Sequence, residues 1–355
     1  MDFRKTEVKV TSVGKAIPQY HRETQDIMPL LDSWLENQEE RFRRKVKKIF
    51  INAAVDKRYS IMAPEEVFTA SSFEEKNEIY SREVIKLGET ALKDALEKAD
   101  WDAQSIDYII TVSCTGIMIP SLDAYLINKL KLRQDIVRLP VTEMGCAAGI
   151  SGILYANDFL KANPGKRAAV IAVESPTATF QLDDYSMANI VSAAIFGDGG
   201  ACVLLSSKEE DSGPRIKDTG MYHFYDAEHM MGFKLTNSGL KMILDPSVPD
   251  TIASHFPLLI NPFLENNNLS IEHINNLIFH PGGKKIVQTV EGLFGEMGKN
   301  IDDTKEVLRA YGNMSSVTVL YVLERFLNRE IENGEYGLML SFGPGFSAQR
   351  ILLQW

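Results

Sequence analysis

The sequence has few cysteines, no long apolar run and no excess of basic residues, and each shortage excludes a class of protein. Three scattered cysteines in 355 residues are too few for a disulfide framework or a thiolate metal site. No apolar run approaches the ~18 residues of a membrane-spanning helix. The opening MDFRKTEVKV alternates charged with apolar residues, unlike a secretory signal. We therefore expect a soluble cytoplasmic protein with reduced thiols, no membrane insertion and no metal site.

The balance of charge argues against a broad nucleic-acid-binding surface. The chain has 38 basic and 48 acidic residues, a formal charge of -10. The longest basic cluster, residues 41–48 (RFRRKVKK), is typical of one solvated helix face, although it is also a candidate for phosphate contacts. Hydrophobic residues at 45% and charged residues at 24% are ordinary for a globular protein, which excludes a disordered chain.

Apolar, β-branched runs that end in small residues or glycine predict buried strands whose loops meet at one edge of a sheet. They span residues 106–116, 166–175, 199–207, 274–283 and 336–345. Helical patterns lie between them, at residues 81–99, 149–162 and 315–329. This alternation indicates an α/β protein. The polar segment 206–215 (SSKEEDSGPR) divides the chain best, into residues 1–208 and 209–355, although no sequence repeat proves that the halves are duplicates.

Cys146 is the first candidate for chemistry. It stands between Gly145 and two alanines in EMGCAAGISGILYANDFL, just before a helical period begins. Backbone N–H groups and the helix dipole at a helix N-terminus favour thiolate, the form that a nucleophile needs. Taken alone, however, most free cysteines are small buried apolar residues, and Cys202 in GACVLLSS is best explained that way.

Two further residues have a setting that suits catalysis. His280 follows the apolar run NNLIF and precedes PGG, so it is displayed at a strand end, where imidazole can relay a proton or donate to an oxyanion. Asn313, in GNMSS, precedes a helix that Ser315 or Ser316 could cap. Asn313 either serves in that cap or donates its amide to a thioester carbonyl or an enolate.

The three motifs GCAAG, HPGG and GNMSS are together far more specific than any one of them. With them the chain resembles the type III polyketide synthases, the chalcone and stilbene synthase-like enzymes of the thiolase-fold class. The resemblance also takes in TSVGKAIPQY, PSLDAYLI, FGDGG and FGPG, and so covers nearly the whole chain. It implies a thiolase-like fold, with two similar α/β halves forming a five-layered αβαβα core, and a homodimer.

The resemblance implies a role for each of the three residues. Cys146 would be the acyl-carrying nucleophile, while His280 and Asn313 would drive decarboxylation of malonyl-CoA and stabilise the enolate. The implied reaction loads an acyl-CoA starter on the cysteine, extends it by repeated condensation with malonyl-CoA, and closes a ring. Both CoA thioesters are substrates, so no cofactor and no obligatory acyl carrier protein are expected.

The resemblance also implies gating residues and a product class. Phe196, in FGDGG, matches a gate between the CoA tunnel and the reaction cavity, although core packing explains it too. Met242, in GLKMIL, stands where plant members have a second gating phenylalanine, and this departure argues against chalcone synthesis. The motifs look bacterial, and a flexible thioether suits a fatty acyl starter, so we expect an alkylpyrone or alkylresorcinol.

Other positions match the reaction cavity or the dimer interface of the family. Cys114 in SCTG matches a cavity position, although strand-end packing explains it equally well, and Thr179 matches a cavity-lining position. Ile119 matches a residue that reaches across the dimer interface into the partner's cavity. Gly343 and Gly345 resemble the floor of the cyclisation pocket.

Contacts to CoA are implied less sharply, because the family's basic residues near the first helices do not align cleanly. Asn52 and Asp56 occupy two of those positions. The nearby candidates for the phosphates and the pantetheine arm are Lys47, Lys48, Lys57, Arg58, Lys284 and Lys285.

Two alternatives remain at this stage. A β-ketoacyl-acyl-carrier-protein synthase III has the same Cys, His and Asn set, but usually shows an asparagine close after its histidine, so HPGG and GNMSS favour the polyketide synthase. A non-catalytic binding protein of the same fold is the other alternative, and the presence of all three residue types argues against it.

Overall fold

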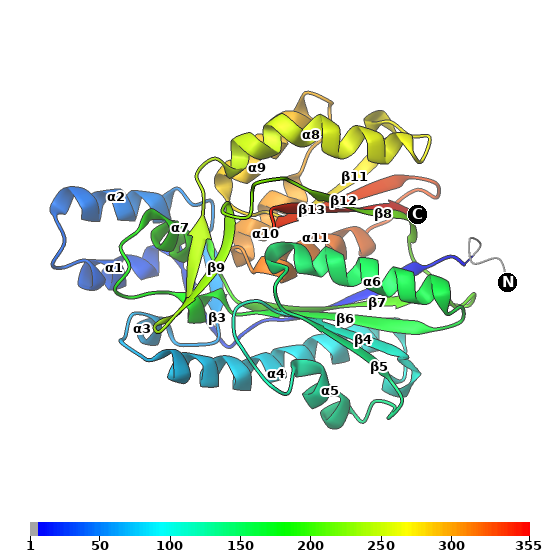
Figure 1. Cartoon of the computed structure of the whole chain (residues 1–355), viewed down its shortest axis with the longest axis horizontal. Coiled ribbons are helices and arrows are strands. Elements are labelled where there is room, and N and C mark those ends of the chain that lie inside the picture. The colour runs from blue at the N-terminus through cyan, green and yellow to red at the C-terminus, as the bar shows by residue number, and fades with distance from the viewer. Residues whose placement is uncertain (1–5) are drawn as a thin grey trace.

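The computed structural model describes residues 6–355, and its helices and sheets form five alternating layers (Figure 1). From one side to the other, these are helices, a sheet, two central helices, a second sheet and a further set of helices. The α/β class and the five-layered thiolase-like core expected from the sequence are thereby confirmed.

The first sheet comes from the N-terminal half. Its strands, in spatial order, are β5 (Val137–Val141), β4 (Tyr108–Val112), β6 (Arg167–Glu174), β7 (Gly199–Ser206) and β1 (Lys9–Ala16). β4 is parallel to β5 and β6, whereas β7 is antiparallel to β6 and β1. Seven of the eight residues of β6 are buried, as expected for a strand that is covered on both faces.

The second sheet comes from the C-terminal half and repeats this order. Its strands are β11 (Ile274–Phe279), β12 (Tyr336–Gly343), β13 (Ser347–Gln354) and β8 (Arg215–His223). β11 is parallel to β12, and β13 is antiparallel to β12 and β8. The two sheets meet at a single residue pair, Lys9 opposite Arg215, so the hydrogen-bonded ladder runs through nine strands.

The two central helices occupy equivalent places in the halves. The helix α6 (Ala148–Ala162) immediately precedes β6, and α11 (Thr318–Leu327) immediately precedes β12. Fully buried side chains of both helices, such as Ile150 and Leu320, join one apolar cluster between the sheets. The duplication is therefore visible in topology, although no sequence repeat reveals it.

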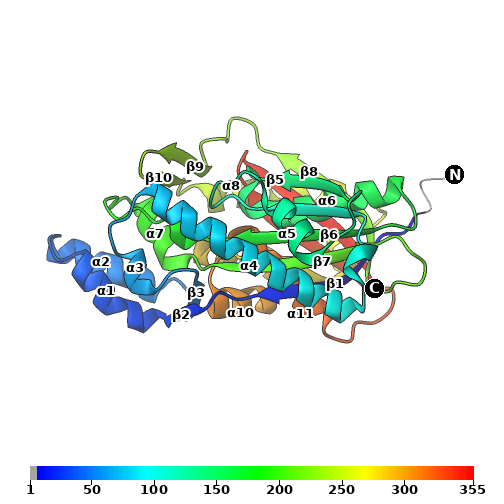
Figure 2. The same cartoon turned by 90° about the horizontal axis from the view of Figure 1, so that it is seen from below.

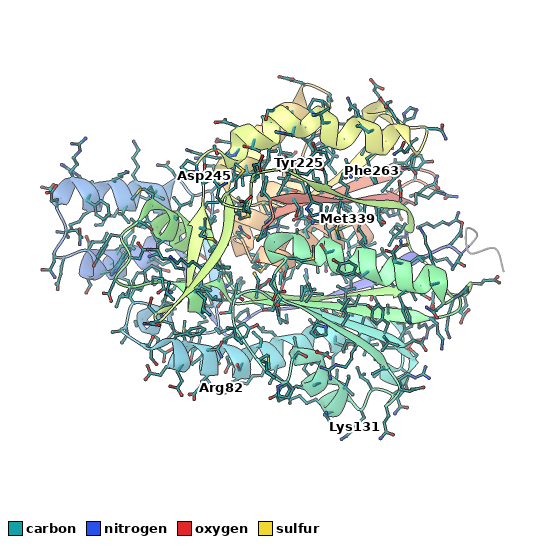
Figure 3. All side chains as sticks on the ribbon, viewed as in Figure 1. Arg82, Lys131, Tyr225, Asp245, Phe263 and Met339 are labelled. Carbon is teal, nitrogen blue, oxygen red and sulfur yellow. The ribbon has the colours of Figure 1, made fainter. Side chains whose placement is uncertain are left out.

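Outer helices cover the remaining faces of the sheets. On the first sheet lie α4 (Phe73–Ala99) and α5 (Leu122–Leu130), and on the second lie α8 (Val248–Glu265) and α9 (Lys284–Gly295). A capping box between Ser72 and Glu75 starts α4, and Asp100 in a left-handed conformation ends it. Figure 3 shows Met339 inside the molecule, while Arg82 and Lys131 point outward from α4 and the end of α5.

A separate group of short elements lies at one end of the molecule, opposite the two chain termini (Figures 1 and 2). It consists of β2 (Tyr20–Glu23), α1 (Met28–Trp34), α2 (Glu40–Ile51), β3 (Lys57–Ser60), α3 (Pro64–Val67), α7 (Met187–Ile195), β9 (Met231–Thr236) and β10 (Gly239–Leu244). The helix α10 (Asp302–Tyr311) packs against β3 and α11. Single turns of 3-10 helix are η2 (Thr24–Ile27), η3 (Ala103–Ser105), η4 (Gly145–Ala147), η5 (Pro176–Thr179), η6 (Ile271–His273) and η7 (Ser315–Val317).

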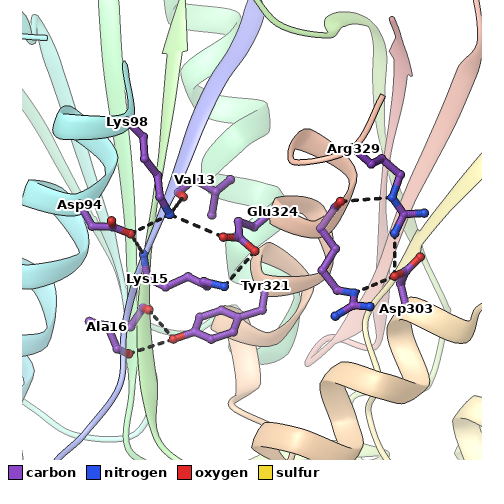
Figure 4. A network of polar contacts seen from close by, with 11 residues as sticks. Val13, Lys15, Ala16, Asp94, Lys98, Asp303, Tyr321, Glu324 and Arg329 are labelled. Atoms are coloured by element: carbon purple, nitrogen blue, oxygen red, sulfur yellow. Dashed lines mark hydrogen bonds and ion pairs between the residues drawn. The ribbon is translucent and has the colours of Figure 1, made fainter. Parts of the chain in front are cut away.

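Polar contacts fix α11 against β1 and α4 (Figure 4). Lys15 Nζ lies 2.9 Å from Glu324 Oε2, and Lys98 Nζ lies 3.5 Å from Glu324 Oε1. The buried hydroxyl of Tyr321 donates to the carbonyl oxygens of Ala16 and Gly200, over 3.0 and 3.2 Å. Leaving such a buried group unpaired would cost about 1–3 kcal/mol, so these contacts hold α11 in place and with it the loop before α11.

No helix within residues 6–355 is both long and apolar enough to cross a membrane.

Candidate active site

The loops at one edge of the two sheets enclose a cavity of about 650 Å³, its open mouth included. Six segments far apart in the sequence each contribute one predicted residue to its lining, namely Cys114, Cys146, Phe196, Met242, His280 and Asn313. These residues lie around one cavity because the two halves are equivalent, with Cys146 just before α6 and Asn313 just before α11. The structure therefore brings the three proposed catalytic residues to one cavity.

The turn that carries Cys146 is held tightly against β12. Gly145 has φ +52°, and a Cβ there would lie 2.5 Å from Pro344 Cδ. A Cβ on Gly343 would lie 2.6 Å from Ala147 Cβ. The hydroxyl of Ser341 also donates to the carbonyl oxygen of Cys146 over 2.9 Å. Only glycine fits at both positions, so the backbone around the thiol is closely packed.

The thiol of Cys146 is partly buried and donates to Ser315 Oγ over 3.5 Å. Burial raises the pKa of the Cys146 thiol to about 12, and this opposes the effect of the helix N-terminus. The thiol is consequently protonated at neutral pH, and forming the nucleophile requires a base in the same cavity.

His280, which lines the same cavity, is the candidate for that base. It follows β11, is almost fully buried, and its backbone N–H donates to the carbonyl oxygen of Leu340 over 2.9 Å. Neither ring nitrogen has a hydrogen-bond partner among the described residues. Burial lowers the pKa of His280 to about 3, so the imidazole is neutral at pH 7. One ring nitrogen can then accept a proton and the other can donate a hydrogen bond.

Asn313 joins three loops around the cavity. Its Nδ2 donates to the carbonyl oxygen of Gly282 over 3.2 Å, and its Oδ1 accepts from the backbone N–H of Ser315 over 2.8 Å. Its backbone N–H donates to the Ile195 carbonyl oxygen over 2.7 Å, next to Phe196. The capping and catalytic alternatives are thus compatible, because the oxygen orders the turn while the amide nitrogen faces the histidine loop.

The sequence analysis missed two polar residues at the site. Glu174, fully buried at the end of β6, accepts from Cys114 N over 3.0 Å and from Ser316 Oγ over 2.7 Å. Burial raises the pKa of Glu174. Ser315, considered only as a cap, has φ +52° and places its Oγ 3.5 Å from Cys146 Sγ and 3.7 Å from Cys114 Sγ. The sequence did contain a signal for Glu174, because it is an acidic residue at the end of an apolar run, AAVIAVE.

A second cavity of about 720 Å³, its open mouth included, adjoins the active-site cavity. Phe196, just after α7, and Met242, on β10, line both cavities. Thr179 lines the second cavity rather than the one that contains Cys146. Gly343 and Gly345 flank Pro344, and it is Pro344 that reaches the active-site cavity.

The remaining predicted residues lie outside the active-site cavity. Ile119 is 94% exposed. Lys47 forms an ion pair with Asp32, with 2.6 Å between Nζ and Oδ1, and Lys57 Nζ lies 4.9 Å from the ring centroid of Tyr59. The exposed candidates for CoA are Lys48 on α2 and Lys285 on α9, whereas Arg58 is buried and lines the second cavity. Within the described part of the chain, no group of His, Cys, Asp and Glu side chains is arranged to hold a metal ion.

Family models of the chalcone and stilbene synthases match both halves of the chain. The N-terminal domain model matches residues 3–209, and the C-terminal domain model matches residues 221–355. The 1,3,6,8-tetrahydroxynaphthalene synthase of Streptomyces peucetius subsp. caesius is 32% identical over 354 residues, which cover 98% of this chain and 93% of that protein. The phloroglucinol synthase of Pseudomonas fluorescens is 30% identical over 309 residues, which cover 87% of this chain and 88% of that protein.

Solved structures agree with these matches. The crystal structure of 1,3,6,8-tetrahydroxynaphthalene synthase from Streptomyces coelicolor A3(2), described as a bacterial type III polyketide synthase, has a TM-score of 0.91 and 27% identity. The match covers 98% of this chain and 99% of that chain. These relatives favour the polyketide synthase over the β-ketoacyl-acyl-carrier-protein synthase III. The chain therefore belongs to the chalcone and stilbene synthase family and is a type III polyketide synthase, an enzyme of the acyltransferase class.

Proposed function

We propose that Cys146 accepts an acyl group from an acyl-CoA starter, that malonyl-CoA extends it by decarboxylative condensation, and that the chain is released after ring closure. The observation that carries this proposal is that Cys146, His280 and Asn313 line one cavity. CoA thioesters and reduced thiols both suit the cytoplasm, where we place the reaction.

The loading step needs proton transfer because the free thiol is protonated. His280 takes the proton from Cys146 as the sulfur attacks the thioester carbonyl carbon. The bond between that carbon and the CoA sulfur then breaks, and the departing thiolate takes the proton from the imidazolium. An acyl thioester on Cys146 and free CoA result, with the histidine neutral again.

The extension step needs stabilisation of an enolate. The Nδ2 group of Asn313 and one ring N–H of His280 donate to the thioester carbonyl oxygen of malonyl-CoA as the carboxylate leaves as carbon dioxide. The enolate carbon attacks the acyl carbon on Cys146, a carbon–carbon bond forms, and the cysteine sulfur departs. Both donors are uncharged at neutral pH, so neither protonates the enolate strongly.

We propose a fatty acyl starter and an alkylpyrone or alkylresorcinol product. The flexible Met242 lines both the active-site cavity and a second, mostly apolar cavity, which suits an alkyl chain. The related enzymes are named for different products, phloroglucinol and 1,3,6,8-tetrahydroxynaphthalene among them, so family membership alone does not define the product. We further propose that Lys48 and Lys285, both exposed, contact the CoA moiety of the substrates.

A homodimer is also part of the proposal. The edge strand β5 is exposed at Val137, and Ile119 is 94% exposed in the loop after β4. An exposed apolar side chain beside an unpaired sheet edge suits contact with a second copy of the chain. Sedimentation of the Ile119→Asp variant tests this, and an undisturbed dimer would exclude Ile119 from the interface.

Product analysis tests the proposed reaction. The purified enzyme is incubated with malonyl-CoA and a panel of short, aromatic and long acyl-CoA starters, and the products are identified by mass spectrometry. We expect cyclised polyketides without any acyl carrier protein, and none from the Cys146→Ala variant. An obligatory need for malonyl carrier protein would contradict the proposal, and equal rates with all starters would contradict only the fatty acyl preference.

A further inference from the structure

The second cavity has a mostly apolar lining that includes one buried charge. It lies among the elements at one end of the molecule, including β3, α3 and α7 (Figures 1 and 2). Most of its lining is apolar or aromatic, as with Phe68 and Phe180. Arg58, in the middle of β3, is only 6% exposed and lines this cavity.

The guanidinium of Arg58 has no acidic partner. Its Nη1 donates to the Ala193 carbonyl oxygen over 3.0 Å, its Nη2 donates to Thr24 Oγ1 over 2.8 Å, and Nε has no partner. No carboxylate among residues 6–355 lies close enough to affect its pKa, and its carbon Cζ lies 5.6 Å from the ring centroid of Phe50. Burial lowers the pKa of Arg58 to about 10, so the charge persists at neutral pH.

A second unpartnered group lines the same cavity. The hydroxyl oxygen of Ser192 is buried without a hydrogen-bond partner among the described residues. Arg58 donates to the backbone of Ala193, the residue that follows Ser192 in α7, and both Arg58 and Ser192 line this cavity. Buried charges and hydroxyls are normally paired, so two unpartnered donors in one cavity indicate an anionic acceptor.

Arg350 provides a contrast within the same molecule. It is 8% exposed and also donates to backbone carbonyl oxygens, including that of Met221 over 3.2 Å. Asp218 lies near enough to stabilise its charge, and Arg350 lines neither of the two cavities. Arg58 differs on both counts, because only burial affects its pKa and its side chain faces unfilled space.

We propose that the second cavity binds an aliphatic chain whose far end carries a carboxylate, which pairs with Arg58 and accepts from Ser192. The planar guanidinium matches a carboxylate, and the apolar walls match the chain. Two sources share this chemistry. One is a dicarboxylic acyl group attached to Cys146 through its other end, which rests on the proposed acyl transfer and makes the starter a fatty acyl chain that ends in a carboxylate, and the other is a free fatty acid.

A binding experiment tests the site without requiring catalysis. Binding of saturated fatty acids of 8 to 16 carbons, and of the matching primary alcohols, is measured by calorimetry with the Cys146→Ala protein. We expect the acid of the preferred length to bind at least about tenfold more tightly than its alcohol, in line with a desolvated ion pair. Arg58→Gln should abolish this preference, and Ser192→Ala should reduce it several-fold.

Control variants keep the test interpretable. Arg350→Gln should preserve the ratio of acid to alcohol affinity, even if it lowers stability. Ser192→Phe fills the cavity and should remove binding of both ligands while Arg58 stays in place. Equal affinity for acid and alcohol in the parent protein, or an unchanged ratio in a folded Arg58→Gln variant, would overturn the proposal.

Kinetics distinguish the two sources. If the ligand is a starter, the mono-CoA thioester of a dicarboxylic acid should exceed the matching fatty acyl-CoA about tenfold in kcat/KM, and Arg58→Gln should reverse this order. If the ligand is a free fatty acid, that acid should inhibit in an Arg58-dependent manner and the two starters should react alike. Binding that depends on Arg58 in a protein that makes no polyketide would refute the proposed function and leave the site standing.

Discussion

The amide nitrogen of Asn313 donates to the carbonyl oxygen of Gly282 over 3.2 Å, which ties the loop before α11 to the loop that carries His280. These loops come from neighbouring parts of the C-terminal half, while the thiol comes from the equivalent loop before α6 in the N-terminal half. The contact fixes the amide beside the histidine before any substrate arrives. Preorganised, uncharged donors of this kind are what an enolate-forming step needs.

Replacing Asn313 by alanine should therefore impair extension more than loading. Losing one donor to a developing oxyanion typically costs about 10²–10³ in kcat. We expect release of carbon dioxide from malonyl-CoA to fall by that factor, while transfer of the starter acyl group to Cys146 changes less than tenfold. Asn163→Ala, which removes an exposed asparagine distant from the cavity, is the control. A parallel loss in both steps would show that Asn313 merely supports the fold.

Ser315 should have opposite effects on thiol reactivity and on stability. Its hydroxyl lies 3.5 Å from Cys146 Sγ and favours the thiolate by donating a hydrogen bond to it once the thiol has lost its proton, while its φ of +52° costs an L-residue about 1–2 kcal/mol. Ser315→Gly removes the hydroxyl and also relieves the backbone strain. We therefore expect slower alkylation of Cys146 by iodoacetamide, together with a rise of roughly 1 kcal/mol in the free energy of unfolding. Faster alkylation, or a loss of stability, would contradict this account of the residue.

The neutral state of His280 predicts how stability depends on pH. Its pKa is lowered to about 3 in the folded protein, against about 6.5 in an unfolded chain. Between these values the unfolded state binds the extra proton, so stability is lost as pH falls below 6.5 and the histidine has no effect above it. At pH 5 the loss is about 2 kcal/mol. Urea unfolding of His280→Gln should show a flatter dependence between pH 4 and 6.5, and an unchanged slope would show that His280 is not the group responsible.

Glycine is needed at position 145 for two separable reasons. Gly145 and Gly165 both have positive φ, but a Cβ on Gly145 would lie 2.5 Å from Pro344 Cδ, whereas nothing lies within 4 Å of a Cβ on Gly165. Gly165→Ala should cost about 1–2 kcal/mol in the free energy of unfolding, and Gly145→Ala should cost more and also slow the loading of Cys146. Equal costs with unchanged loading would indicate that the loop around Pro344 yields freely.

The strands and helices with strong periodicity could be predicted from the sequence. The buried run at 166–175 became β6, and the helical pattern at 149–162 became α6, because long apolar periods are dominated by burial. The hairpin of β9 and β10 was not predicted, since its side chains are largely exposed or only partly buried. The two prolines within α8 likewise mask its helical period.

The candidate site could likewise be predicted only in part. The catalytic motifs could be read because each stands at a strand end or a helix start, where backbone geometry displays a side chain. The second cavity could not be predicted, because Arg58 and Ser192 are distant in sequence. Their place in one lining depends on how α7 packs against β3. Burial also decides the pKa of Cys146. The sequence indicated only that the thiol lies at a favourable helix terminus, and it contains no measure of how deeply the thiol is buried.

The central claim is that Cys146 carries the acyl group, and intact mass measurement followed by peptide mapping tests it most directly. The enzyme is incubated with a long-chain acyl-CoA in the absence of malonyl-CoA. We predict one added acyl group per chain, located on Cys146, lost in Cys146→Ala, and discharged as product when malonyl-CoA is supplied. An acyl group on Cys114 or Cys202 instead, or polyketide formation by Cys146→Ala, would contradict the account.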